Sequence, residues 1–198
     1  MHDENRREPI FNAPGVVVGL LALLVGMHAG REWLLPRLMD AESIDAWMLA
    51  LAFIPARYGG TIGDIPGGSL ASVTSFLTHT LVHIDWMHLI INGAWLAAFG
   101  SALARRIGSG RFLVLYALSA IAGALLYLAV NGTAPVVMVG ASGAVSGLVG
   151  AAFRFFFRAV DEARFDPEGL AGAARHVPRM SFAEMAADRR LQIAVGVW

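Results

Sequence analysis

Four stretches of the chain are apolar over roughly the 20 residues that a helix needs to cross the hydrocarbon core of a membrane. They cover residues 10–29, 87–103, 112–130 and 139–157. A fifth apolar stretch covers residues 191–198 and stops at the last residue. The pattern predicts an all-α polytopic membrane bundle with four spans and the start of a fifth. We expect one membrane domain over residues 1–198, incomplete at its C-terminus.

Two longer connections separate these stretches. Between the first and second, residues 47–55 predict a short helix lying in the outer leaflet, and the glycine-rich residues 58–68 predict turns. Residues 158–190 are charged and predict a surface-lying cytoplasmic insertion. Within this insertion, Asp166-Pro167 has the character of a helix start. Ser181 and Glu184 have the spacing of a capping box, which predicts a helix leading into the fifth stretch.

Composition supports a membrane location and narrows the chemistry. Hydrophobic residues make up 57% of the chain and charged residues 15%, whereas a soluble domain carries about 25% charged residues. The formal net charge is zero, so the sequence gives no electrostatic reason to expect binding to nucleic acid. There is no cysteine, which excludes disulfides, thiolate metal sites and a cysteine nucleophile. We expect neither a cofactor nor a metal.

The distribution of the 15 arginines predicts the orientation in the membrane. Three of them, Arg31, Arg37 and Arg57, follow the first span, whereas the other twelve precede it, separate the second and third spans, or lie around and after the end of the fourth. The positive-inside rule makes the side with twelve arginines cytoplasmic. We therefore expect an integral protein of a bacterial inner membrane with a cytoplasmic N-terminus.

Polar side chains inside apolar stretches are costly and usually functional, and three of them form a pattern. Ser142 lies in the glycine-rich fourth stretch, and His88 and Asn92 are four residues apart, so they share one face of a helix. Helix rise puts Ser142 roughly 18 Å from Arg154 and Asn92 roughly 20 Å from Arg105. Two separate segments thus carry polar groups to one depth in the outer half of the membrane. A second pattern, Gly143, Gly147 and Gly150, predicts close packing by a neighbouring helix.

The residues from Phe76 to Gly150 resemble the rhomboid family of intramembrane serine proteases. The shared pattern is Phe76-Leu-Thr-His79, then His83, His88 and Asn92, then Phe99-Gly100, Arg105-Arg-Ile-Gly-Ser-Gly-Arg-Phe112 and Gly140-Ala-Ser-Gly143. The resemblance implies a helical bundle in which Ser142 attacks a peptide carbonyl of a transmembrane substrate. His88, Asn92 and the backbone N–H of Ser142 would stabilise the oxyanion. His83, Gly140 and Gly143 would form a supporting polar shell, and His79 would pack the outer loop.

The chain departs from the family pattern at three places. Thr74-Ser75 stands where the family commonly has a Trp-Arg pair, and Ala104 where it often has an acidic residue. The third departure concerns the general base that a serine nucleophile requires. In rhomboids this base is a histidine in a Gly-x-His motif on a later helix, but no histidine follows His176 here. His176 itself lies on the predicted cytoplasmic side, across the membrane from Ser142.

Three interpretations remain open. The chain is an N-terminal fragment of a rhomboid protease whose catalytic histidine lies on helices beyond Trp198, and the end within an apolar run favours this interpretation. Alternatively, it is a catalytically inactive rhomboid-like protein that binds transmembrane helices. A small transporter or channel would also use buried His and Asn, but it explains the Gly-x-Ser-Gly run less well. In each case the expected partners are the lipid bilayer and transmembrane segments of other proteins.

Overall fold

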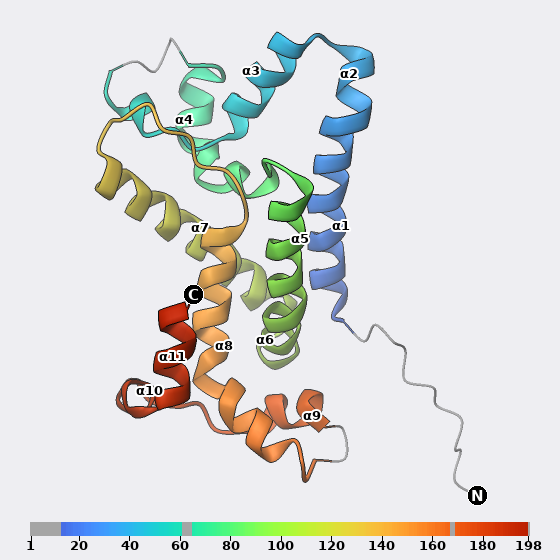
Figure 1. Ribbon diagram of the computed structural model, residues 1–198, viewed down its shortest axis with the longest axis vertical. Coiled ribbons are helices and arrows are strands. Elements are labelled where there is room, and N and C mark those ends of the chain that lie inside the picture. The colour runs from blue at the N-terminus through green and yellow to red at the C-terminus, as the bar shows by residue number, and fades with distance from the viewer. Residues whose placement is uncertain (1–12, 61–64, 167–168, 198) are drawn as a thin grey trace, which may run out of the picture.

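The computed structural model describes residues 13–60, 65–166 and 169–197 (Figure 1). All regular structure in these ranges is helical, and the one β feature in them is an isolated bridge between Phe53 and Met138. Four helical stretches are long and apolar enough to cross a membrane. The predicted all-α bundle with four spans is therefore confirmed. The beginning of the first predicted stretch, residues 10–12, lies outside the described residues.

The first span covers Gly15–Leu38 and is nine residues longer at its C-terminal end than the predicted 10–29. It consists of α1 (Gly15–Ala29), a π-helical turn η1 (Gly30–Leu34) and α2 (Leu35–Leu38). Pro36 explains the π-helical turn, because proline has no N–H to donate and its ring clashes with the carbonyl four residues earlier. The helix continues past this distortion, so the predicted end at residue 29 is wrong.

The second span covers Trp86–Ile107 and contains the predicted 87–103. It runs as α5 (Trp86–Trp95), the π-helical turn η4 (Leu96–Gly100) and α6 (Ser101–Ile107). A π-helical turn accommodates an extra residue without the usual rise of about 1.5 Å. The distance along the helix from Asn92 to Arg105 is thus slightly shorter than the sequence estimate, and closer to that from Ser142 to Arg154.

The third and fourth spans pack directly on each other. The third, α7 (Ser109–Asn131), follows a sharp turn at Gly108, whose φ of +79° suits glycine. The fourth, α8, covers Ser142–Glu162 instead of the predicted 139–157. Residues 139–141 therefore form a turn before the helix, and the first five residues of the predicted insertion, 158–162, belong to the helix.

The connection between the first and second spans forms a compact layer over one end of the spans (Figure 1). It contains α3 (Ala41–Leu51), η2 (Pro55–Tyr58), α4 (Gly68–Thr78) and η3 (His79–Leu81). The predicted helix at 47–55 actually begins at Ala41, because Asp40 caps it by accepting a hydrogen bond from the Ser43 backbone N–H. Part of the predicted 58–68 turn region, residues 61–64, lies outside the described residues.

At the opposite end lie α9 (Gly169–His176), α10 (Phe182–Ala187) and α11 (Arg189–Val197). The capping box of Ser181 and Glu184 is present, but α10 ends at Ala187 and does not run on into α11. Pro167, in the predicted helix start, lies outside the described residues. Ala173, Ala174, Val177 and Met180 are buried in the main core, so the prediction of a purely surface-lying insertion is wrong.

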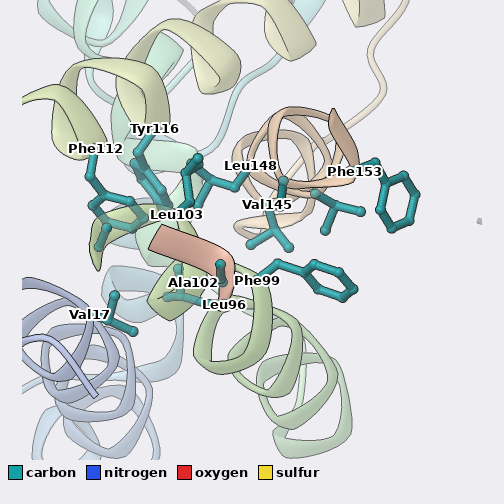
Figure 2. Close-up of a cluster of buried hydrophobic side chains, with 14 of the residues drawn as sticks. Val17, Leu96, Phe99, Ala102, Leu103, Phe112, Tyr116, Val145, Leu148 and Phe153 are labelled. Atoms are coloured by element: carbon teal, nitrogen blue, oxygen red, sulfur yellow. The ribbon is translucent and has the colours of Figure 1, made fainter. Parts of the chain in front are cut away.

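The core lies where the second, third and fourth spans meet, with the first span at its edge (Figure 2). Figure 2 shows Leu96 and Phe99 of the π-helical turn η4 near Val145 and Leu148 of α8. Other apolar side chains of α7, such as Leu118 and Leu126, are exposed on the bundle surface. Apolar exposure of this kind suits contact with lipid. The bundle thus holds α5 and α8 side by side, and these helices carry His88 and Ser142.

Candidate active site

The turn before α8 is held in place by backbone hydrogen bonds from the connection between the first and second spans. Phe53 and Met138 exchange two N–H to carbonyl hydrogen bonds, of 3.0 and 2.9 Å. The Gly140 N–H donates to the His79 carbonyl at 2.9 Å. Residues from two other segments therefore fix the backbone that delivers Ser142 to the start of α8.

Gly140 meets the imidazole of His88. A Cβ at this position would lie 2.5 Å from Cε1 and 2.6 Å from Nε2 of His88, closer than any real contact. The φ of Gly140 is +106°, a conformation that L side chains rarely adopt. Only glycine fits both requirements. The His88 ring is thus packed against the backbone two residues before Ser142.

Ser142 is the first residue of α8 and is exposed. It therefore lies at the helix end, which differs from the sequence prediction of a serine within a helical span. The first α-helical hydrogen bond runs from the Val145 N–H to the Ala141 carbonyl. The preceding N–H groups, of Ser142, Gly143 and Ala144, have no carbonyl one turn earlier in the helix to receive them. These N–H groups and the helix dipole favour negative charge beside Ser142.

His88 and Asn92 lie on one face of α5, as their spacing predicts. The N-cap Asp85 accepts a 2.7 Å hydrogen bond from the His88 backbone N–H, which fixes the start of the helix. Asn92 is buried, and its side-chain amide donates to the His88 carbonyl at 2.9 Å. An amide nitrogen carries two N–H groups. One of them is thus occupied within the helix, and the other is available to a further acceptor.

His83 is fully buried between His88 and the turn before α8. Its ring lies edge to face against His88, with centroids 5.0 Å apart, and its Nε2 accepts a 3.3 Å hydrogen bond from the Ala141 N–H. Burial, assisted by the electrostatic effect of nearby His88, His28 and Arg31, lowers the pKa of His83 to about 4. His83 is therefore neutral at pH 7, with its proton on Nδ1, since Nε2 is an acceptor.

The remaining described histidines have other surroundings. The Nδ1 of buried His79 lies 2.7 Å from the Ser75 carbonyl, and burial lowers the pKa of this imidazole. The ring of His28 packs edge to face on Trp86, with centroids 4.5 Å apart. His176 lies on α9, 3.7 Å from Asp166, beyond the far end of α8. Since α8 is about 30 Å long, His176 is far from Ser142.

The glycines Gly143 and Gly147 let α8 pack closely against α7. A Cβ at Gly123 of α7 would lie 3.3 Å from the Gly143 Cα, and a Cβ at Gly147 would lie 2.0 Å from the Ser119 Oγ. The predicted close approach is thus present at Gly143 and Gly147. Gly150 has nothing within 4 Å of its Cβ position among the described residues, so the prediction is wrong there.

The site includes a residue whose role the sequence did not reveal. Arg31, in the C-terminal half of the first span, donates 2.7 and 2.8 Å hydrogen bonds to the carbonyls of His83 and Ile84. It thereby ties the first span to the loop that carries His83. No local pattern marks this role, because the two segments are more than fifty residues apart.

Thr74, Ser75 and Ala104, which depart from the family pattern, lie in helices and make local contacts. Thr74 is exposed and its hydroxyl donates to the Leu70 carbonyl of its own helix. Ser75 is buried, and its carbonyl contacts His79. Ala104 is part of the apolar core. The described structure thus accommodates these residues within α4 and α6.

Comparison with known proteins agrees with this architecture. A family model for the rhomboid domain matches residues 70–174, more than half of the chain. The chain is 31% identical over 83 residues to the rhomboid protease GlpG of Haemophilus influenzae, a match covering 42% of each protein. It is 39% identical over 75 residues to the rhomboid protease GluP of Bacillus subtilis, covering 38% of this chain and 14% of the relative.

A third relative, the putative rhomboid protease YdcA of Bacillus subtilis, is 42% identical over 77 residues, which cover 37% of each protein. The matched segments span less than half of the length of each of these relatives. The family match, the four spans and the helical bundle lead to one conclusion. This chain is an integral membrane protein that belongs to the rhomboid family.

Proposed function

We propose that the protein is an intramembrane serine endopeptidase in which Ser142 is the nucleophile and His88 and Asn92 assist it. The observation that carries this proposal is the contact between Gly140 and His88. It brings an imidazole against the backbone that leads into an exposed serine. A packing role for Ser142 would not require the exposed position.

The groups around Ser142 suit the stabilisation of an oxyanion. When the Ser142 Oγ attacks a peptide carbonyl, the carbonyl oxygen becomes negatively charged. The Ser142 N–H at the start of α8, the His88 ring and the second Asn92 N–H are the donors we assign to it. In a site that excludes bulk water, one such donor is worth about 3 to 4 kcal/mol.

The reaction also requires a base that accepts the Ser142 proton and later protonates the leaving amine. His83 accepts from Ala141, His79 contacts Ser75, and His28 packs on Trp86. We therefore propose that the base is a histidine supplied from outside these 198 residues, as the resemblance to rhomboids implies. A catalytically inactive protein that binds transmembrane helices is the alternative, and it is favoured if no such histidine exists.

We propose transmembrane segments of other membrane proteins as substrates. A helix hides its carbonyls in intrahelical hydrogen bonds, so a substrate has to unwind before Ser142 can attack. The buried Nδ1 of His83 has no hydrogen-bond partner among the described residues. A water molecule bound there would give the site its hydrolytic water, which agrees with a polar shell around Ser142.

The proposed orientation has a cytoplasmic N-terminus in a bacterial inner membrane. The arginine distribution supports it, since twelve of the 15 arginines fall on one side of the four spans. Single cysteines in place of Gly108 and Thr133 test it in intact cells with an impermeant thiol reagent. We expect labelling of Thr133→Cys and protection of Gly108→Cys, and the reverse pattern would overturn the orientation.

The direct test is cleavage of a transmembrane substrate by the product of the complete gene. We expect Ser142→Ala to abolish cleavage and Ser146→Ala, one turn along α8, to leave it nearly unchanged. The 198 residues alone should show no turnover. Cleavage by Ser142→Ala would refute the assignment of the nucleophile, and Ser142-dependent cleavage by the 198 residues alone would direct attention to His28 or His83 as the base.

A further inference from the structure

A second polar site lies at the end of the bundle opposite Ser142. There the described residues line a half-open cavity of about 420 Å³, within the range typical of ligand sites. Five arginines from four parts of the chain line it: Arg106, Arg111, Arg154, Arg175 and Arg179. No aspartate or glutamate is among the described residues of its lining. The cavity therefore concentrates positive charge.

Two of these arginines have hydrogen-bond partners that leave their charge in place. Arg106 donates to the carbonyls of Ala174 and Val177, at 3.1 and 2.7 Å. Arg154 donates through Nε and Nη2 to the Met180 carbonyl, at 3.2 and 3.1 Å. A carbonyl oxygen satisfies the hydrogen bonds of a guanidinium without neutralising its charge. These contacts fix the segment after α9 against α6 and α8, and they keep the guanidinium groups at the cavity.

The positive charges of these arginines also act on one another. The charge of Arg179 acts on Arg106, and that of Arg175 acts on Arg105 beside the cavity. Like charges gathered in one site repel each other unless a bound anion offsets them. Arginine is well suited to such an anion, because its planar guanidinium binds phosphate with two parallel hydrogen bonds.

The position of the cavity indicates the source of the phosphate. Arg106 lies at the end of the second span and Arg111 in the first turn of the third, which is the level of lipid headgroups. The rest of the lining includes the apolar side chains Leu103, Leu115 and Phe155. A soluble phosphate would gain nothing from this apolar wall, whereas a phospholipid has acyl chains to lay against it. Basic pockets between spans bind the headgroups of anionic lipids in this way.

We propose that this cavity binds the phosphate headgroup of an anionic phospholipid. The site joins α6, α7, α8 and the α9 segment, so the lipid would connect the inner ends of the second, third and fourth spans to the segment that follows them. The inference does not rest on proteolysis, because no residue of the cavity belongs to the Ser142 site.

Binding of phosphatidylglycerol to the purified protein in a neutral detergent tests the proposal. The test variant is Arg111→Gln with Arg179→Gln, which keeps the carbonyl contacts of Arg106 and Arg154. The matched control is Arg164→Gln with Arg189→Gln, two exposed arginines at the same end that are not in the lining. Native mass spectrometry measures retained lipid, and thermal unfolding without lipid checks that both variants fold.

We expect the test variant to bind phosphatidylglycerol about tenfold or more weakly, and the control to change by less than about twofold. Phosphatidylcholine and inorganic phosphate at equal concentrations should not bind measurably to the original protein or to either variant. Equal weakening in both variants would overturn the proposal, because it would indicate a general surface charge effect. Inorganic phosphate binding as tightly as the lipid, and only with Arg111 and Arg179 intact, would overturn the lipid assignment in favour of a soluble phosphate compound.

Discussion

The two ends of α8 carry polar groups into the bundle in different ways. At the first end, around Ser142, lie the imidazoles of His83 and His88 and the amide of Asn92, and Gly140 lets the His88 ring approach the backbone. At the second end, Arg154 and Arg106 donate hydrogen bonds to backbone carbonyl oxygens, which do not neutralise a guanidinium. The first arrangement favours charge that appears only during a reaction. The second favours a permanent anion.

Adding a side chain at Gly140 should reduce cleavage more than any other change predicted here except loss of Ser142. Gly140→Ala would strain a backbone with φ of +106° and place a methyl group 2.5 Å from His88 Cε1, so the ring must move. A displacement of about 1 Å in a catalytic group can cost about a hundredfold in rate. We expect cleavage by the product of the complete gene to fall by about a hundredfold or more.

Gly150→Ala is the matched control on α8, because its Cβ would meet nothing within 4 Å among the described residues. It should leave cleavage within about twofold, since alanine is the better helix former. If Gly140→Ala cleaves as well as Gly150→Ala, the contact between Gly140 and His88 has no part in the chemistry.

Removal of one oxyanion donor should slow cleavage without abolishing it. Asn92→Ala keeps Ser142 and His88, and we expect kcat to fall by about tenfold to a thousandfold with little change in KM. The substitution also removes a hydrogen bond to the His88 carbonyl, worth about 1 kcal/mol of stability. Steady-state kinetics on a transmembrane substrate, with the thermal midpoint as a check on folding, measures both effects. A rise in KM at constant kcat would assign Asn92 to substrate binding instead.

The Ser142 end should contribute a pH dependence to the free energy of unfolding, because it contains His83, a buried neutral histidine. The pKa of His83 is about 4 in the folded protein and about 6.5 when unfolded, so the unfolded chain takes up a proton first as the pH falls. The contribution of His83 to the free energy of unfolding is fully present above pH 6.5 and is lost as the pH falls from 6.5 to 4. By pH 4.5 the loss amounts to about 2 to 3 kcal/mol.

His83→Gln removes this titration while other acid-sensitive groups stay in place. The free energy of unfolding in detergent, measured at pH 7.5 and 4.5, should therefore fall further in the original protein than in the variant. An equal fall in both proteins would mean that His83 is not held neutral by its surroundings.

Much of this fold is predictable from local pattern, since apolar length alone identifies the four spans. The spacing of His88 and Asn92 likewise predicts their common face, and Ser181 and Glu184 predict their capping box. Helix boundaries were less predictable, because they depend on single residues such as Asp40, which starts α3 six residues before the expected position. Apolar length alone could not reveal that Ser142 begins a helix.

Features set by long-range contacts were not predictable. The bridge between Phe53 and Met138 and the hydrogen bonds of Arg31 join segments whose sequences carry no shared signal. Arg31 and the arginines of the cavity look alike in a charge count, yet one ties a loop and the others line a pocket. Position in the sequence predicts the side of the membrane, but only the packing distinguishes these roles.

The most direct test of the central claim is the reaction of Ser142 with a fluorophosphonate probe, mapped by tandem mass spectrometry on the product of the complete gene. The account predicts one covalent adduct on Ser142, none on Ser146, and loss of labelling in Ser142→Ala. A folded protein that forms no adduct on Ser142 would contradict the account and favour a rhomboid-family protein that binds transmembrane helices without cutting them.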